Sequence, residues 1–306
     1  MSPLELFLQQ LINGIALGGI YALIALGYTM VYGIIELINF AHGDVFMLGS
    51  FVAIAVLSVF GLGHPATGAS LILVLLYLFL ATSVLSGLIG VVIERVAYRP
   101  LRNAPRLAPL ISAIGVSFIL QNIVFLWRGP SPVSFPDVMP EAVITVGNVI
   151  IRGKQIFILF SSLIMMASLQ LFVQRTRMGK AMRATAQDPS AAALMGINVN
   201  YTIALTFFIG SALAGAAGII YGLYYTSVVF NIGYIAGLKA FTAAVLGGIG
   251  NLGGAMLGGF LIGIIEAFSA QYSSQAWADS IVFAVLILVL ILRPTGLLGQ
   301  QLAERA

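Results

Sequence analysis

Long apolar runs constrain this chain more than any other feature of its sequence. Residues 70–93, for example, contain no charged side chain and are long enough to cross a bilayer as a helix, which takes about 20 residues. Charged residues make up 8% of the chain, against about 25% in a typical soluble domain, and the mean hydropathy is +1.07. A soluble fold would lack the polar surface needed to stay dispersed. The sequence therefore predicts an all-α, polytopic integral membrane protein with a single transmembrane domain over residues 1–306.

Similar runs recur along the chain and predict its membrane helices. We expect these helices at residues 6–35, 45–62, 70–93, 107–127, 155–173, 201–229 and 277–292. Residues 237–268 differ, because a glycine-rich turn divides them into two apolar pieces that are each short for a full crossing at about 1.5 Å per residue. Such pieces predict broken or re-entrant helices, which are tolerated where they face protein or water. Together the runs predict about eight crossings, within a range of about seven to nine.

Basic residues gather in two loops and set the expected orientation. The first loop contains Arg95, Arg99, Arg102 and Arg106, and the second, residues 174–200, contains Arg175, Arg177, Lys180 and Arg183. Because Lys and Arg are retained on the cytoplasmic side, we expect both loops and the C-terminus inside and the N-terminus outside. The net charge of +4 then reflects membrane topology rather than nucleic-acid binding.

The longest stretch without a helical pattern, residues 128–154, is expected on the external side. It is rich in proline, and its second half predicts a small β-hairpin around Gly147 and Asn148. A weak similarity between residues 16–21 and 214–221 leads to the further hypothesis of an inverted repeat, an arrangement that is frequent in transporters.

The second basic loop carries the pattern of a very short helix with both ends marked. Asp188 is a suitable N-cap, Pro189 suits the first helical position, and Gly196 suits a left-handed C-terminal cap. The segment comprises Asp188, Pro189, Ser190, Ala191, Ala192, Ala193, Leu194, Met195 and Gly196. A helix of about two turns is marginal alone, so it must dock on something. One interpretation is a mechanical coupling to a cytoplasmic motor, framed by the basic residues of the loop. The other is an ordinary capped turn between two membrane helices.

Polar groups inside apolar runs are costly and by default indicate a transport pathway. The candidates for a pathway or hinge are Glu36, Asn39, His42, Asp44 and Glu266, together with the glycine-rich turn formed by Gly247, Gly248, Gly250, Asn251, Gly253 and Gly254. A structural role is the alternative for the first group, because Asp44 could simply cap the helix that follows it and His42 could lie at the interface. Glu94 beside Arg95 is expected to be an interfacial anchor.

The sequence contains no pattern of an active site. It has no cysteine, which excludes disulfides and thiol catalysis, and its two separated histidines do not form a metal-binding pattern. The dipeptide Gly179-Lys180 lacks the upstream glycine of a Walker A motif. We therefore expect that the chain is not an enzyme, binds no cofactor of its own and does not hydrolyse ATP itself.

Four segments, taken in order, resemble one known family. They are Asn39-Phe40-Ala41-His42-Gly43, the loop from Gly179-Lys180 to Gly196, Gly247-Gly248-Ile249-Gly250 with Gly253-Gly254, and Arg293-Pro294-Thr295-Gly296-Leu297-Leu298-Gly299. This combination resembles the LivH-type permease of branched-chain amino-acid ABC importers, over nearly the whole chain. The loop departs from the Glu-Ala-Ala signature of many other importers, since Ala186-Gln187-Asp188 occupies that neighbourhood.

The resemblance implies a multi-subunit machine in a bacterial inner membrane. Such a permease pairs with a second, LivM-like permease. Two cytoplasmic ATPase subunits bind ATP and magnesium, and a periplasmic binding protein delivers the amino acid. Residues 188–196 would then be the coupling helix, and leucine, isoleucine and valine would cross by alternating access. Two alternatives stay open: the same mechanism with urea, short amides or other amino acids as cargo, or a stand-alone channel or ion-coupled carrier.

Overall fold

The computed structural model describes residues 2–105 and 107–299, so Arg106 of the first basic loop lies outside the described residues. Within these ranges, eight helices are long and apolar enough to cross a membrane. They are α1 (Pro3–Ile35), α2 (His42–Val59), α3 (Gly68–Ile93), α4 (Leu107–Arg128), α5 (Gly153–Arg175), α8 (Val199–Tyr225), α10 (Leu252–Tyr272) and α11 (Gln275–Leu292). The prediction of an all-α polytopic membrane protein is confirmed.

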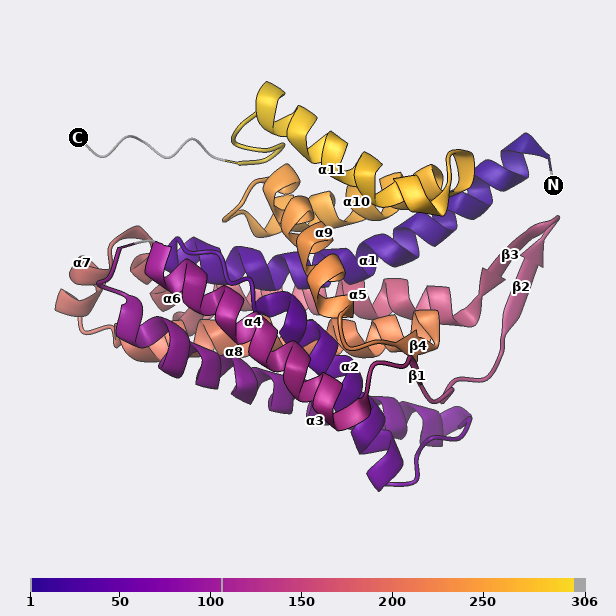
Figure 1. Ribbon diagram of the computed structural model, residues 1–306, viewed down its shortest axis with the longest axis horizontal. Helices are drawn as coiled ribbons and strands as arrows, with labels where there is room; N and C mark the ends of the chain where they lie inside the picture. Colours follow the sequence, from indigo (N-terminus) through magenta and orange to yellow (C-terminus); the bar gives the residue numbers. More distant parts are fainter. Residues whose placement is uncertain (1, 106, 300–306) are drawn as a thin grey trace.

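Shorter elements connect these helices. They are a π-helical turn (Glu94–Tyr98) and a 3-10 turn (Arg99–Leu101) that extend α3, the helices α6 (Arg177–Gln187), α7 (Pro189–Leu194) and α9 (Ile232–Gly247), and the strands β1 (Val133–Ser134), β2 (Val143–Val146), β3 (Val149–Arg152) and β4 (Ser227–Val228). Figure 1 shows the long helices lying side by side along the longest axis of the molecule.

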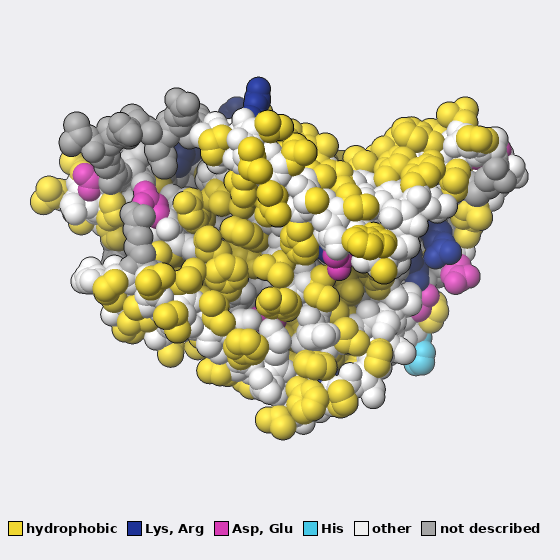
Figure 2. Space-filling model, turned by 45° about the horizontal axis from the view of Figure 1, so that its top comes forward, with side chains coloured by type: hydrophobic (Ala, Val, Ile, Leu, Met, Phe, Trp, Pro, Cys, Tyr) yellow, Lys and Arg dark blue, Asp and Glu magenta, His cyan; other side chains and the backbone are white. Residues whose placement is uncertain are grey.

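Helices α1, α2 and α8 form the interior, whereas α3, α4, α5 and α11 lie around them. In the most apolar 18-residue stretch of α1, 94% of the residues are buried, whereas in the corresponding stretch of α11 only 11% are buried. The outer helices expose large side chains such as Leu80, Leu126 and Ile291. Hydrophobic side chains accordingly dominate the face in Figure 2. This is the surface expected of a protein solvated by lipid.

Two units of the fold, α1 with α2 and α8 with α9, repeat each other in opposite directions and are called the two halves of the repeat below. Helix α1 is followed by residues 36–41 and α2, and α8 is followed by residues 226–231 and α9, so the two linkers are equal in length. Each long helix ends on a non-glycine residue in the left-handed conformation, Glu36 with φ 53° and Thr226 with φ 56°. Helices α1 and α8 run in opposite directions (Figure 1). These features describe an inverted repeat.

The correspondence differs from the similarity noticed in the sequence. Because Glu36 matches Thr226 in the structure, Tyr21 matches Ser211 and not Tyr221. The similarity between residues 16–21 and 214–221 is therefore not the register of the repeat, which is carried by backbone geometry at the linkers.

The second helix of each half begins deep inside the protein. The His42 ring, at the start of α2, lies 3.2 Å from the carbonyl oxygen of Ile24, well before α1 ends. A Cβ added to Gly43 would lie 2.2 Å from the carbonyl oxygen of Gly233, at the start of α9. The two helix starts therefore touch, and only glycine permits this contact.

This arrangement corrects the expected position of the broken helices. Both pieces beside the glycine-rich turn were described as short for a full crossing and were expected to be broken or re-entrant. Helix α9 is short, but α10 has 21 residues and is long enough to cross. The sequence had also placed the second helix at residues 45–62, whereas α2 begins at His42 in the interior.

Small residues allow α1 and α10 to pack with their backbones in contact. A Cβ added to Gly18 would lie 2.7 Å from the Cα of Phe260, and one added to Gly263 would lie 2.2 Å from the nitrogen of Gly18. Membrane helices gain little from burying apolar surface against each other, so close packing of this kind is what holds them together.

The external loop and the start of α1 occupy one end of the molecule. Strands β2 and β3 form the predicted hairpin with Gly147 and Asn148 at its turn. The Asn148 side-chain amide donates to Glu5 over 3.1 Å, and Gln9 bonds the backbone of Ile150. Helix α7 lies at the opposite end (Figure 1).

The packing of α1 on α10 gives a test of the fold. Replacing Gly18 by alanine should force the two helices apart, and overpacking typically costs about 1–3 kcal/mol. We expect a lower melting temperature of the detergent-solubilised protein by fluorescence-detected size exclusion.

Gly115, on α4, is the matched control, because an added Cβ there meets no atom within 4 Å. Gly115→Ala should leave the melting temperature unchanged or raise it, since alanine favours the helix by about 1 kcal/mol. An equal response of the two variants would contradict the packing argument.

Candidate functional site

The short helix α7 has the capped geometry expected from the sequence. The Asp188 carboxylate accepts hydrogen bonds from the backbone nitrogens of Ser190 at 2.8 Å and Ala191 at 3.0 Å. Pro189 is the first helical residue. These contacts satisfy the amide groups that a helix start leaves unpaired. The capped helix is therefore confirmed as local structure, and its role stays a prediction.

The other end of α7 closes with a paired set of backbone bonds. The nitrogen of Gly196 donates to the carbonyl of Ala193, and that of Ile197 donates to Ala192, both over 3.0 Å. Gly196 adopts φ 82°. This is a Schellman motif, for which glycine is preferred because it tolerates the left-handed conformation. Both ends are thus fixed by short-range contacts, which makes α7 rigid for its length.

Two large apolar side chains project from the end of α7. Leu194 is 89% exposed and Met195 is 83% exposed, whereas Ala192 is buried against the rest of the chain. Ala192 thus attaches the helix to its own protein, and Leu194 with Met195 form an apolar tip that is free to contact another surface.

The second basic loop also contains α6, a helix that the sequence analysis missed. Helix α6 is capped by Thr176, whose hydroxyl accepts from the nitrogen of Gly179 at 3.0 Å. Its buried residues are Gly179, Met182 and Thr185. The cap and this helical spacing were the available signals. Arg175 ends α5, and Arg177, Lys180 and Arg183 lie exposed on α6, which precedes α7 in the chain.

The first basic loop holds a buried ion-pair cluster. Glu94 is fully buried and pairs with Arg99 at 2.9 Å and with Arg102. Burial lowers the pKa of Arg102, which the attraction of Glu94 opposes. Glu94 was expected to be an interfacial anchor beside Arg95. Its ion-pair partners are Arg99 and Arg102, which follow the π-helical turn over residues 94–98, and the anchoring role stays a prediction.

The polar residues near the start of α2 are buried inside the protein. Asn39 accepts a hydrogen bond from the Tyr98 hydroxyl at 3.2 Å. The rings of His42 and Tyr28 are 4.7 Å apart. Asn39, His42 and Asp44 are each at most 2% exposed. The structure therefore brings these three candidates together. Glu36 lies apart from them, at the end of α1, where Glu36 and Arg102 line a polar cavity of about 160 Å³.

Asp44 does not act as the simple N-cap that one interpretation assigned to it. The residue before α2 is Ala41, and no side chain caps this helix. Asp44 instead lies in the first turn, and its Oδ2 accepts a hydrogen bond from Ser117 on α4. A Cβ added to Gly233 would lie 2.6 Å from Asp44 Oδ1. The carboxylate thus lies between the first turns of α2 and α9, whose positive dipole ends stabilise a negative charge.

The glycine-rich turn joins α9 to α10 and is held by the last described segment of the chain. Leu297 and Leu298 donate backbone hydrogen bonds to the carbonyls of Leu246 at 2.8 Å and Gly247 at 2.9 Å. Asn251 caps α10 and donates to the carbonyl of Leu298 at 2.8 Å. Gly248 and Gly250 adopt positive φ. Gly247 and Gly254 allow the backbones of α9 and α10 to touch. Gly253 lies in the first turn of α10.

Glu266 belongs to a charged cluster that the sequence analysis did not find. Its carboxylate lies 2.7 Å from Lys239 Nζ on α9 and accepts from the Tyr21 hydroxyl on α1 at 2.8 Å. Lys239 also pairs with Asp279 on α11 at 2.7 Å. The signal was a lysine inside the apolar run that became α9, since an ionisable residue there is costly without partners.

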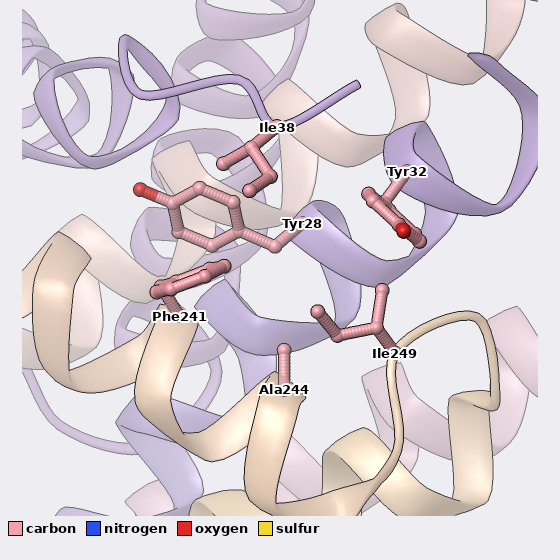
Figure 3. A pocket seen from close by; sticks show the side chains of 6 residues that line it. All are labelled: Tyr28, Tyr32, Ile38, Phe241, Ala244 and Ile249. Atoms are coloured by element: carbon pink, nitrogen blue, oxygen red, sulfur yellow. The ribbon is translucent and has the colours of Figure 1, made fainter. Parts of the chain in front are cut away.

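A small apolar cavity lies where the two halves of the repeat meet. It is lined by Tyr28, Tyr32, Ile38, Phe241, Ala244 and Ile249 and has a volume of about 10 Å³ (Figure 3). The rings of Tyr28 and Phe241 pack edge to face, with centroids 6.2 Å apart. A cavity of this size has room for about one water molecule. It is too small to hold an amino acid.

Comparison with known proteins assigns the chain to a family. Residues 10–290 match the model described as branched-chain amino acid transport system / permease component. The chain is 48% identical to the high-affinity branched-chain amino acid transport system permease protein BraD of Pseudomonas aeruginosa, with 98% of each chain covered. It is 47% identical to the LivH permease protein of the corresponding system in Escherichia coli K12, covering 98% of this chain and 97% of LivH.

A more distant relative is the autoinducer 2 import system permease protein LsrC of Klebsiella pneumoniae, 27% identical over 65% of this chain and 58% of that protein. No solved structure matches the chain. The full-length similarity and the eight apolar helices agree, and the chain belongs to the family of branched-chain amino acid transport system permease components.

Proposed function

We propose that this chain is the membrane permease subunit of an ATP-driven importer of the branched-chain amino acids leucine, isoleucine and valine. The observation that carries the proposal is the identity of 47–48% over nearly the full length to two permeases of high-affinity branched-chain amino acid transport systems. The partners are a second, LivM-like permease, two cytoplasmic ATPase subunits and a periplasmic binding protein. ATP and magnesium bind to the ATPases.

The proposed orientation places the end with α7 in the cytoplasm of a bacterial inner membrane. The exposed basic residues of α6 and the Glu94 cluster lie on loops that the positive-inside rule retains there. The hairpin of β2 and β3 packs on the start of α1, which supports an outer position for that end of α1, beside the external loop. The binding protein would then approach this outer end.

Helix α7 is the proposed contact with an ATPase subunit. Leu194 and Met195 offer an apolar tip that is 89% and 83% exposed, and apolar residues in an aqueous loop gain by entering a groove. The caps at Asp188 and Gly196 fix the helix, so a displacement of the ATPase would move α7 as a unit rather than unwind it. Arg175, Arg177, Lys180 and Arg183 would steer an acidic rim around that groove.

Movement inside the membrane is proposed to occur where the halves of the repeat meet. The contact of Gly43 with Gly233 and the turn from Gly247 to Gly254 bring backbone atoms close together, and the rings of Tyr28 and Phe241 pack where the halves meet. One half would rock against the other at these glycine contacts, which is the usual route to alternating access. The buried side chains of Asn39, His42 and Asp44 would keep the starts of α2 and α9 aligned during this movement.

One prediction of this proposal concerns the subunits. Tagged chain purified from its native host in mild detergent should carry a second permease and two ATPase subunits, identified by mass spectrometry. Proteoliposomes of this complex should accumulate leucine only with ATP and the binding protein. A homo-oligomer that transports leucine without ATPases would overturn the proposal.

The second prediction concerns the tip of α7. Leu194→Asp should leave both caps and the buried Ala192 intact but place a charge in the ATPase groove, with a loss of about 2 kcal/mol or more in binding. Co-purification of the ATPases should fall at least about tenfold, while the second permease is retained.

Ile144→Asp is its matched control, because Ile144 is also an exposed apolar residue but lies in the hairpin at the other end. It should retain the ATPases at the wild-type level. Normal ATPase recovery with Leu194→Asp would refute the docking role.

A further inference from the structure

Four side chains from four helices form a connected polar cluster that the proposed coupling does not use. Lys239 Nζ on α9 lies 2.7 Å from both Glu266 on α10 and Asp279 on α11. The second oxygen of Glu266 accepts a hydrogen bond from Tyr21 on α1. Lys239 Nζ is also 5.8 Å from the centre of the Tyr21 ring. Glu266 and Tyr21 therefore hold the lysine from its buried side.

The charges of this cluster do not balance. One lysine faces two carboxylates, which leaves one negative charge in excess. Lys239 and Glu266 are buried, with side chains 6% exposed, but the Asp279 side chain is 44% exposed. Asp279 lies on α11, and only 11% of the residues in the most apolar 18-residue stretch of this helix are buried. A half-exposed carboxylate facing hydrocarbon is costly, so this side of α11 needs a polar environment, which water at the outer end, a passage or another protein would provide.

The cluster lies in the half of the membrane domain nearest the N-terminus. Asp279 is in the second turn of α11, about 6 Å from the start of the helix at about 1.5 Å per residue. Gln10 near the start of α1 bonds Gln271 near the end of α10 at 2.9 Å, and Phe7 packs on Phe268. The connection between α10 and α11 is therefore at the same end as the hairpin, which is the outer end in the orientation proposed above.

The arrangement suits a small zwitterion with adjacent ammonium and carboxylate groups. If such a molecule enters between Lys239 and Asp279, its carboxylate can accept from Lys239 and its ammonium can donate to Asp279. One ion pair is then replaced by two, and the charge of the cluster does not change because the guest is neutral overall. An amine alone or an acid alone could satisfy only one of the two residues.

We propose that Lys239 and Asp279 form an outer binding site for the ammonium and carboxylate groups of an α-amino acid, with Glu266 and Tyr21 positioning Lys239. This inference rests on the proposed function, because it names where the cargo would bind within the permease. The apolar side chain of the amino acid would lie against the hydrophobic surface around Asp279. The site would receive the amino acid from the binding protein at the outer end.

The test measures leucine directly on the purified multi-subunit complex without its binding protein. Binding of radiolabelled leucine is followed by scintillation proximity, and uptake is measured separately with saturating, leucine-loaded binding protein. Asp279→Asn should weaken leucine binding about tenfold or more, since it removes a hydrogen bond between charged groups. Uptake per assembled complex should fall in parallel. Asp279→Glu, which keeps the charge, should recover part of both.

Asp137→Asn is the matched control. Asp137 is also a partly exposed carboxylate paired with a lysine, Lys154, at 2.9 Å, but it lies in the external loop. This variant should bind and transport leucine as the wild type does. In the wild type, 3-methylbutylamine and 4-methylpentanoate, which each carry one of the two charged groups, should compete far less well than unlabelled leucine.

The outcomes separate this inference from the function on which it rests. A wild-type complex without ATP-driven leucine uptake would refute the proposed function before any variant is compared. If the wild type takes up leucine but shows no measurable leucine binding, the proposed binding site is refuted while the proposed function stands. The same holds if Asp279→Asn binds leucine as tightly as the wild type does. Loss of the second permease from the Asp279→Asn complex would assign Asp279 to the contact between permeases, and would also overturn the site.

Discussion

The contact between the starts of α2 and α9 is the constraint on which the rest of the fold depends. Both helices begin inside the protein, where Gly43 and Gly233 place their backbones in contact. Each helix start carries unpaired amide groups that cannot be left in hydrocarbon. The extended linkers that lead to these starts can therefore exist only because α1, α4 and α8 surround them. Helix α1 packs on both α2 and α9, and α4 and α8 pack on α2.

Asp44 is a polar group that contributes to the contact between α2 and α9. Its carboxylate lies between two helix starts and accepts from Ser117, so it connects both halves of the repeat to α4. The nearby Asn39 and His42 contact α1 and Tyr98 rather than an open channel. These buried groups are more consistent with holding the central contact than with lining a permanent passage.

The sequence predicted what local chemistry determines and missed what depends on neighbours. Apolar runs located the long helices, and the residues at Asp188, Pro189 and Gly196 predicted α7 with its caps, because these signals act within a few positions. The interior start of α2 was not predictable in this way, since the run around His42 does not show where α1 will lie. Helix α6 was missed because its basic residues suggested a loop, although Thr176 and the spacing of Met182 and Thr185 indicate a helix.

Only part of the charged cluster around Lys239 could be recognised in the sequence. Glu266 stood out as an acid in an apolar run, but its partners lie on α9, α11 and α1, and nothing in the spacing of these residues brings them together. Lys239 could have been identified from its setting alone. Its two partners could be identified only once the packing of α9 against α10 and α11 was known.

The segment that closes the turn between α9 and α10 has a consequence for how the protein is made. Asn251 bonds Leu298, a residue 47 positions later, and the carbonyls of Leu246 and Gly247 are satisfied by Leu297 and Leu298. During synthesis, α9 and α10 therefore enter the membrane before the residues that complete their connection have been translated. The turn stays open until α11 has also been inserted, so the last steps of biogenesis determine when this half of the protein becomes rigid.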